Sequence, residues 1–407
     1  MNRAAPNARR TPLPVGHQFA REEGPNPRRH KILEVLGEGG FGITYRGRMP
    51  SGEEVAIKEF FPSGHSERSH SCQVAPLPDS YAQFEAAKAF FEKEAETLRA
   101  MAPHPNVVGI RSHFTRHNTA YMVMDLVRGH SVHDYLVKMA EGQFDPTGED
   151  VRQFLIGVAS GLAHVHDAQI LHGDIKPQNI LIDEPDGRPI LIDFGASREM
   201  KDAKQRPDFI SLTFAAIELI HAGLHSAIGP WSDIYSLGVV AYMLATGTTP
   251  ATAVARGDAV FNHGRPDPIR PCVSACRPGI DRDLAEIIDA CLALDPSDRP
   301  QSADALAARL RHGPGRDQVT RIYGRARRLD EGQVRQALLV VIAPRSDPER
   351  PAPASPAPTP PPAPRQPPGP GEDGVGALEL LLFLIVIVFL GLLTYAAYLV
   401  LQTDALS

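Results

Sequence analysis

Between residues 30 and 312, the first part of the chain alternates apolar and polar positions, and a helical spacing dominates further along. Alternation is typical of strands with one buried face, and apolar residues three or four positions apart predict amphipathic helices. One such helix places Phe154, Val158, Leu162 and Val165 on a single face. The pattern therefore predicts an α+β fold whose strands come first and whose helices follow.

Both ends of the chain lack this pattern. Residues 1–29 are rich in proline, arginine and asparagine, and we expect them to be disordered. Residues 313–345 allow only a short helix or strand, so they form an extension of uncertain structure. Residues 346–375 are rich in proline, which predicts an extended polyproline II linker. The alternative is that this segment binds an SH3- or WW-type domain.

An apolar run without a charged residue extends from Leu380 to Leu401. As a helix it would be about 33 Å long, enough to cross the hydrocarbon core of a bilayer. A buried helix of a soluble core is the alternative, but a soluble helix of this length normally has a polar face. Residues 380–401 are therefore predicted to form one transmembrane helix, followed by a short tail, 402–407.

Charge and cysteine usage exclude two other classes of protein. The formal net charge of −6 argues against a nucleic-acid binder, since such proteins usually carry a basic face. The four cysteines have no CxxC spacing and no histidine cluster completes a zinc motif, so we interpret them as reduced thiols. The first 30 residues contain no apolar leader, and the N-terminal part is expected to stay in the compartment where it is made.

A glycine-rich motif, Gly37–Gly42 (GEGGFG), lies between two strand-like stretches. Without a Cβ atom, glycine lets backbone N–H groups approach phosphate oxygens closely. In a dinucleotide-binding fold the glycines would open a helix, whereas here a second strand follows. The motif therefore favours a hairpin that covers phosphates and argues against a Rossmann oxidoreductase.

A second motif, Val55–Lys58 (VAIK), ends a strand. Lys58 would lie opposite the glycine-rich hairpin, where its charge can meet the α- and β-phosphates of a nucleotide. A lysine after a strand is usually a solvated surface residue, but the spacing from the glycine motif favours the nucleotide-binding role.

Two further motifs follow the amphipathic helix. His172–Leu181 (HGDIKPQNIL) contains Asp174 and Asn179, and Ile190–Gly195 (ILIDFG) contains Asp193. Loops of one hairpin can bring these side chains together, so that they orient a hydroxyl group and hold a divalent cation through oxygen ligands. Magnesium needs few carboxylates, because phosphate and water oxygens complete its octahedron.

Taken together, the motifs resemble the eukaryotic-like Ser/Thr protein kinase family in its bacterial form. The resemblance covers residues 30–312, with the motifs in family order. It implies a two-lobed protein kinase fold, with a small β-rich N-lobe and a larger helical C-lobe, and ATP and Mg²⁺ as cofactors.

The resemblance also implies roles for single residues. Asp174 would be the catalytic base, Lys176 would contact the γ-phosphate, and Asn179 and Asp193 would hold Mg²⁺. The glycines that would cover the phosphates are Gly37, Gly39 and Gly42.

Lys58 would pair with the α- and β-phosphates, and a glutamate on the helix of the N-lobe would anchor it. Glu94 is the expected anchor, with Glu92 and Glu96 as alternatives. The adenine pocket would be lined by Leu36, Thr44, Ala56, Met124 and Leu181.

In the C-lobe, Asp233 resembles the aspartate that braces the catalytic loop. Glu218 and Arg299 resemble a structural ion pair, with a surface pair as the alternative. Ser211 matches the threonine that supports the catalytic aspartate in Ser/Thr kinases, which favours Ser or Thr over Tyr as acceptor.

Three departures from the family pattern stand out. Gly173 replaces an arginine that normally receives a phosphorylated activation loop, so we expect activity to depend little on such phosphorylation. Ile217 replaces a proline, which frees the backbone there. Residues 60–84 form an insertion that we expect to be a surface loop.

The sequence thus predicts a protein Ser/Thr kinase that transfers the γ-phosphoryl group of Mg·ATP to proteins. A catalytically weak pseudokinase scaffold is the alternative, and a small-molecule phosphotransferase is a third. Because ATP is cytosolic, we expect a single-pass protein of the inner membrane with a cytoplasmic kinase domain. Protein substrates and self-association for autophosphorylation are expected, and nucleic acid is not.

Overall fold

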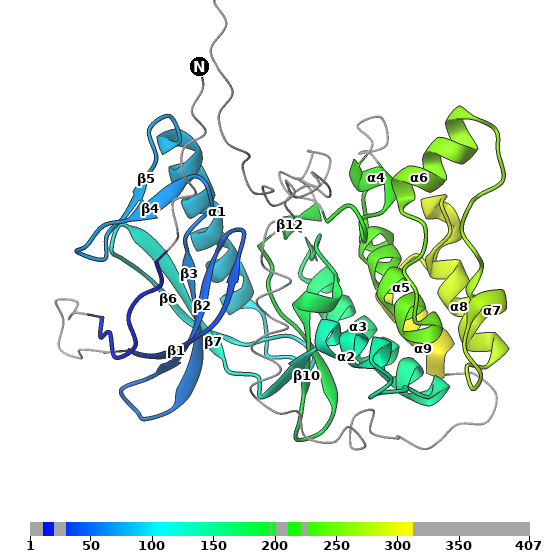
Figure 1. Cartoon of the computed structure of the whole chain (residues 1–407), viewed down its shortest axis with the longest axis horizontal. Helices are drawn as coiled ribbons and strands as arrows, with labels where there is room; N and C mark the ends of the chain where they lie inside the picture. Colours follow the sequence, from blue (N-terminus) through cyan, green and yellow to red (C-terminus); the bar gives the residue numbers. More distant parts are fainter. Residues whose placement is uncertain (1–10, 20–29, 196, 201–210, 221–226, 312–407) are drawn as a thin grey trace, which may run out of the picture. The chain divides into compact units, whose positions relative to one another are not determined.

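The computed structural model describes residues 11–19, 30–195, 197–200, 211–220 and 227–311. The predicted linker and transmembrane helix, with the extension before them, lie outside these residues. Within the described ranges, no helix has the length and apolar character needed to span a bilayer. The described chain forms a β-rich N-lobe and a helical C-lobe (Figure 1), as the resemblance predicts.

The N-lobe is built on an antiparallel five-stranded sheet in the order β1-β2-β3-β7-β6. Its strands are β1 (Lys31–Gly39), β2 (Gly42–Arg48), β3 (Glu54–Phe60), β6 (Ile110–Arg116) and β7 (Thr119–Asp125). The neighbouring strands β3 and β7 are buried along almost their whole length, whereas the edge strand β6 stays partly exposed. The end of β3 is therefore paired with a neighbouring strand on both sides, which fixes the backbone of the residues there.

The helix of the N-lobe, α1 (Tyr81–Ala100), packs on this sheet (Figure 1). Its buried residues Phe84, Phe91 and Leu98 recur at helical spacing, so they form one apolar stripe. The ring of Phe60, at the end of β3, lies 5.3 Å from the ring of Phe84. The helix is thus fixed against the strand that carries Lys58.

Helices make up most of the described C-lobe. They are α2 (Val132–Ala140), α3 (Gly148–Asp167), α4 (Ile217–Ile220), α5 (Pro230–Thr246), α6 (Ala253–Gly257), α7 (Cys272–Ala275), α8 (Arg282–Cys291) and α9 (Ala303–Arg311), with the short helical turns η1 (Pro177–Asn179), η4 (Asp258–Asn262) and η5 (Pro296–Asp298). Capping boxes start α2 and α3, where Ser131 and Asp134, or Thr147 and Asp150, satisfy each other's backbone amides.

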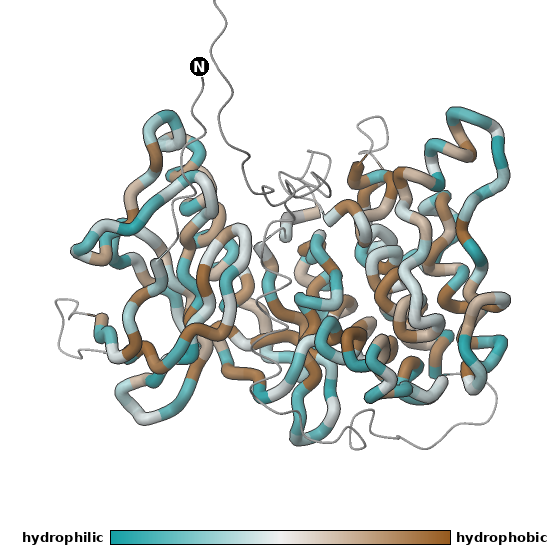
Figure 2. Tube along the Cα trace, in the orientation of Figure 1, coloured by the Kyte–Doolittle hydropathy of each residue, from teal (hydrophilic) through white to brown (hydrophobic). Residues whose placement is uncertain are grey.

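The core of the C-lobe is the helix α5. Every residue from Ser232 to Tyr242 is buried, and the helix contacts α3, α8 and α9. A helix that is buried all round lies inside a core rather than on its surface. Figure 2 shows hydrophobic stretches along the helices and strands inside the lobes and hydrophilic stretches at many of the turns.

Short antiparallel sheets position the two aspartate motifs. In the described residues they are β8 (Gly129–Ser131) with β10 (Ile180–Asp183) and β11 (Arg188–Leu191), and β9 (Ile170–Leu171) with β12 (Arg198–Glu199). A separate hairpin, β4 (Ser66–Arg68) with β5 (Val74–Pro76), lies in the insertion between β3 and α1. Asp174 lies between β9 and β10, and Asp193 follows β11. Because β10 and β11 pair, both aspartates come to the same end of one hairpin.

Two expectations from the sequence are wrong. Residues 11–19, in the segment expected to be disordered, pack against the N-lobe, with Leu13 and Phe19 buried. Backbone hydrogen bonds between this segment and the start of β1, among them that from the amide of Gly16 to the carbonyl of Ile32, add to this contact. Composition averaged over the segment reveals neither the two apolar side chains nor these bonds. The insertion 60–84 is not simply a loop, since it forms the β4–β5 hairpin and begins α1 at Tyr81.

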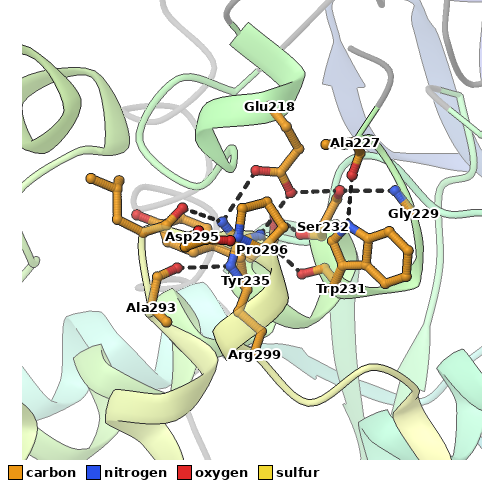
Figure 3. Close-up of polar contacts among 12 residues, drawn as sticks. Glu218, Ala227, Gly229, Trp231, Ser232, Tyr235, Ala293, Asp295, Pro296 and Arg299 are labelled. Atoms are coloured by element: carbon orange, nitrogen blue, oxygen red, sulfur yellow. Dashed lines mark hydrogen bonds and ion pairs between the residues drawn. The ribbon is translucent and has the colours of Figure 1, made fainter. Parts of the chain in front are cut away.

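The predicted ion pair of the C-lobe is confirmed (Figure 3). Arg299 Nη1 lies 2.7 Å from Glu218 Oε1, and both side chains are fully buried. Ser232 Oγ donates to the same carboxylate at 2.7 Å, and the guanidinium also donates to the carbonyls of Ala293 and Leu294. These added hydrogen bonds matter because a buried ion pair is tolerated only when its remaining polar groups are satisfied.

Arg299→Met should therefore be strongly destabilising, because it leaves the Glu218 carboxylate buried without its cation. We expect a loss of about 3–5 kcal/mol in the free energy of unfolding, measured by urea denaturation. Arg282→Met is the matched control, since Arg282 pairs with Glu286 on the surface, and it should leave the midpoint unchanged. Equal midpoints for the two variants would contradict the importance of the buried pair.

Candidate active site

The glycine-rich motif forms the turn between β1 and β2. A Cβ atom on Gly42 would lie 2.0 Å from the backbone oxygen of Glu59 on β3, so only glycine fits there. A Cβ atom on Gly37 or Gly39 would meet no atom closer than 4.0 Å. The fold itself does not require these two glycines, which agrees with a surface kept open for a ligand that approaches the backbone.

Lys58 lies on β3 between Thr44 of β2 and Met122 of β7. Its ammonium group is 2.5 Å from Oδ1 of Asp193, so the structure joins two of the predicted site residues across the lobes. Burial disfavours the charged lysine, but the carboxylates of Asp193 and Glu94 outweigh burial and raise the pKa of Lys58. Lys58 is therefore a cation in this site.

Glu94 lies on the buried face of α1, as predicted, but it does not form the expected ion pair with Lys58. Lys58 contacts Asp193 instead, and Oε2 of Glu94 is buried without a hydrogen-bond partner. Burial raises the pKa of Glu94 to about 7, even though the charge of Lys58 acts in the opposite direction. Burial also disfavours ionised Asp193, but the contact with Lys58 lowers the pKa of Asp193 to about 2.

Three side chains hold the carboxylate of Asp174. Ser211 Oγ donates to Oδ1 at 2.6 Å, while Lys176 Nζ and Asn179 Nδ2 donate to Oδ2 at 2.5 Å and 3.0 Å. The predicted contact between Ser211 and Asp174 is therefore present. A carboxylate fixed in this way can accept a proton from a hydroxyl group without first having to reorient.

Asp233 of α5 holds the backbone of the catalytic loop. Its oxygens accept hydrogen bonds from the amides of His172 and Gly173, each at 2.9 Å, and His166 Nε2 lies 2.9 Å from Oδ2. Burial opposes ionisation, but the hydrogen bond and charge of His166 outweigh it and lower the pKa of Asp233. His166 is not among the residues predicted from the sequence, because nothing in its helical context distinguishes it from other histidines of the chain.

Gly173 has a left-handed backbone, with φ of 76°. An arginine, the usual residue of the family, would be strained in this conformation by about 1–2 kcal/mol. The hydrogen bond to Asp233 holds the glycine in it. Replacement of arginine by glycine thus removes a charge and relaxes the backbone at the same time.

Asn179 and Asp193 fit a magnesium ion by the chemistry of their donors. Asp193 is ionised, and Asn179 uses its Nδ2 group to contact Asp174, which leaves its side-chain carbonyl oxygen as a second oxygen donor. Oxygen ligands of this kind are those that Mg²⁺ prefers. In the described part of the chain there is no group of three or more His, Cys, Asp or Glu side chains that could hold a metal.

The residues predicted to line the adenine pocket come from five strands, four of the N-lobe sheet and one of the C-lobe. Ala56 of β3 pairs with Met124 of β7 in the sheet register, and both are buried. Leu36 of β1, Thr44 of β2 and Leu181 of β10 are partly exposed. Partial exposure suits residues that line a cleft.

Glu94→Gln should change the dependence of stability on pH. The pKa of Glu94 is about 7 in the folded protein and near the ordinary value of 4.5 when unfolded. Between these values the folded protein binds more protons, so the stability due to this group is full below about pH 4.5 and is lost as the pH rises through 7. Glutamine does not titrate. The free energy of unfolding of the variant, relative to that of the wild type, should therefore rise by about 3 kcal/mol as the pH increases from 5 to 8.

Urea denaturation at several pH values measures this difference. Glu92→Gln, on the same helix but less buried, is the control and should keep the wild-type dependence on pH. Parallel curves for Glu94→Gln and the wild type would contradict the unpaired, buried state of Glu94.

Comparison with known proteins agrees with this geometry. Residues 30–310 match the family Pkinase, described as protein kinase domain. "Serine/threonine-protein kinase C" of Synechocystis sp. is 31% identical over 69% of this chain and 49% of its own length. "Serine/threonine-protein kinase pkn2" of Myxococcus xanthus is 30% identical over 69% of this chain and 32% of its own length.

A solved structure described as "PpkA-294 apo form" superposes with a TM-score of 0.61 at 28% identity, covering 74% of this chain and 99% of that one. The chain spans about half or less of the length of the curated bacterial relatives it matches. The family match includes both lobes and all the motifs around Lys58, Asp174 and Asp193. The chain therefore belongs to the protein kinase family.

Proposed function

We propose that the chain is a protein Ser/Thr kinase that transfers the γ-phosphoryl group of ATP to Ser or Thr hydroxyl groups of proteins. The observation that carries the proposal is the arrangement around Asp174, whose carboxylate contacts Lys176, Asn179 and Ser211. The kinase names of the bacterial relatives support it.

In the proposed reaction, the bond between the γ-phosphorus and the oxygen that bridges to the β-phosphate breaks. A bond from the acceptor hydroxyl oxygen to the same phosphorus forms. Asp174 orients the hydroxyl group and accepts its proton. Lys176, held 2.5 Å from that carboxylate, offsets negative charge on the transferring group.

The N-lobe contributes phosphate binding. The backbone of the glycine-rich turn covers the phosphates, and the cation of Lys58 pairs with their oxygens. Mg²⁺ held by Asn179 and Asp193 supplies further charge neutralisation when it is bound. ATP and Mg²⁺ are accordingly the proposed cofactors.

The choice of Ser and Thr over Tyr rests on Ser211. Its hydroxyl joins the activation segment to the catalytic aspartate at 2.6 Å and lies 3.4 Å from Lys176 Nζ. This contact keeps the segment close to Asp174, which suits an acceptor with a short side chain.

A pseudokinase scaffold is the alternative function. Its specific support is the contact of Lys58 with Asp193, which occupies both groups with each other. The presence of Lys58, Asp174 and Asp193 favours the active enzyme, because a scaffold has no need of a supported catalytic base.

We further propose that activity depends little on activation-loop phosphorylation, because Gly173 offers no cation to a phosphate. Lys201, Lys204 and Arg206, which could supply a cation in place of the family's arginine, lie outside the described residues. Self-association for autophosphorylation is part of the same proposal.

Phosphoryl transfer can be measured with the full-length protein, Mg²⁺, γ-labelled ATP and a generic acceptor protein. We expect label on Ser or Thr. Asp174→Asn should lower the rate by about 10²–10⁴-fold, the usual contribution of a general base, and Lys58→Met should also lower it.

Asp304→Asn, on the exposed side of α9, makes the same chemical change far from the site and should keep the wild-type rate. Equal label with wild type and Asp174→Asn would reject the assigned base. Tight ATP binding without any label would favour the scaffold instead.

We also propose that residues 380–401 anchor the protein in the inner membrane, with the kinase domain in the cytoplasm. The uncharged apolar run supports a single span, and the cytosolic location of ATP supports the orientation. The proline-rich segment 346–375 would then separate the kinase domain from the bilayer.

Membrane fractionation after alkaline carbonate extraction tests the anchor. The wild type should remain in the membrane pellet. Ile385→Arg with Val388→Arg should move the protein to the supernatant, because each central arginine costs about 2.5–3.5 kcal/mol on insertion. Ile385→Leu with Val388→Leu is the control and should stay in the pellet. The same distribution for both double variants would contradict the span.

A further inference from the structure

The residue next to Lys58 carries a fully buried charge. Glu59 has no exposed surface, and its side chain lies on the opposite face of β3 from that of Lys58. Oε2 accepts hydrogen bonds from Arg68 Nη2 at 2.5 Å and from Tyr45 OH at 2.7 Å, and Oε1 accepts one from Tyr121 OH at 2.5 Å. Such a carboxylate is stable only with its partners in place, because a buried charge without them is strongly unfavourable.

Arg68 belongs to the inserted hairpin, on strand β4. Its side chain is only 4% exposed, and besides Glu59 it donates to the carbonyl oxygens of Thr11 at 2.6 Å and Cys72 at 3.1 Å. Its guanidinium stacks 4.7 Å from the ring centroid of Phe61. One side chain thus joins β3, the hairpin and the N-terminal segment.

The N-terminal segment closes this cluster from outside. The amide of Leu13 donates to Tyr45 OH at 3.0 Å. The ring of Phe19 lies 4.8 Å from that of Tyr121 and 5.1 Å from that of Phe114. The segment therefore covers the tyrosines that bind Glu59.

The hairpin also contacts the elements around α1. The amide of Val74 donates to the carbonyl of His117, and Asn118 Nδ2 donates to the carbonyl of Val74 at 2.9 Å. Figure 1 shows the hairpin beside the first turns of α1, which begins five residues after the end of β5. The insertion is thus fixed to the sheet at both β3 and the β6–β7 turn.

The cluster reaches the nucleotide site through the backbone of β3. The carbonyl oxygen of Glu59 is the atom against which Gly42 packs, and Gly42 lies in the glycine-rich turn. Any shift of Glu59 would displace this turn on one side and Lys58 on the other.

We propose that Arg68 is a positioning residue for Lys58: by holding Glu59 it fixes the end of β3, and with it the ammonium group that meets the nucleotide phosphates. The proposal rests on the proposed role of Lys58 in nucleotide binding. It assigns a function to the insertion and to residues 11–19, which together support β3 on the face opposite Lys58.

A double-mutant cycle on nucleotide affinity tests the proposal with the full-length protein. Binding of Mg·ATP is measured by titration calorimetry for the wild type, Arg68→Met, Lys58→Met and the double variant. We expect Arg68→Met to weaken binding about tenfold in the wild type, and less than about twofold when Lys58 is already absent.

A merely structural role gives a different result. If Arg68→Met weakens binding by the same factor with and without Lys58, Arg68 does not act through Lys58 and the proposal is wrong. If Lys58→Met leaves the affinity unchanged, the role of Lys58 fails, and the proposal fails with it. The phosphoryl-transfer assay of the wild type separates these results from failure of the kinase function itself.

Two further variants keep the test decisive. Should Arg68→Met not fold, the double variant Glu59→Gln with Arg68→Met replaces it in the same cycle. This double variant removes the charge of Glu59, which would otherwise be buried without its partner, and it still lacks the side chain of Arg68. Arg48→Met is the matched control, because Arg48 pairs with Glu54 at an exposed position between the neighbouring strands β2 and β3. It should leave the affinity within about twofold, and an equal loss for both arginines would overturn the proposal.

Discussion

A single buried carboxylate, that of Asp233, receives hydrogen bonds from two successive amides of the catalytic loop and from His166. The loop between β9 and β10 has little regular structure of its own, so its shape depends on this acceptor. Asp233 can act in this way because α5 is buried on all sides and cannot tilt without disrupting the C-lobe. Its neighbour Ser232 contacts the Glu218–Arg299 pair. One turn of α5 therefore fixes both the catalytic loop and the end of the activation segment.

In the active site, the carboxylates of Asp193 and Glu94 both interact with the charge of one lysine, Lys58. Asp193 is in contact with Lys58 and is ionised, while Glu94 is left buried with a pKa of about 7. Lys58 favours the ionised form of both carboxylates, whereas the charge of Asp193 disfavours ionisation of Glu94, and the contacts in this structure satisfy only one pair. The site therefore holds its cation through an aspartate of the C-lobe rather than through the helix of the N-lobe.

Much of this site could be predicted from the sequence, because its residues lie in short motifs whose local backbone determines their direction. Asp174, Asn179 and Ser211 meet as expected, and Glu94 lies on the expected helix. The partner of Lys58 could not be predicted, since it depends on how closely two lobes approach. The packing of Leu13 and Phe19 was also missed, as it depends on tertiary contacts that a composition average does not contain.

The buried pair of Glu59 and Arg68 constrains how chains of this kind can diverge. Loss of either charge alone leaves the other without its partner and costs about 3–5 kcal/mol, whereas loss of both leaves no unpaired charge but removes the acceptor of the Tyr45 and Tyr121 hydroxyl groups. A related chain that lacks the hairpin should therefore also lack an acidic residue at the position of Glu59. The hairpin and this glutamate would be inherited or lost together, so their joint presence would mark a lineage among protein kinases.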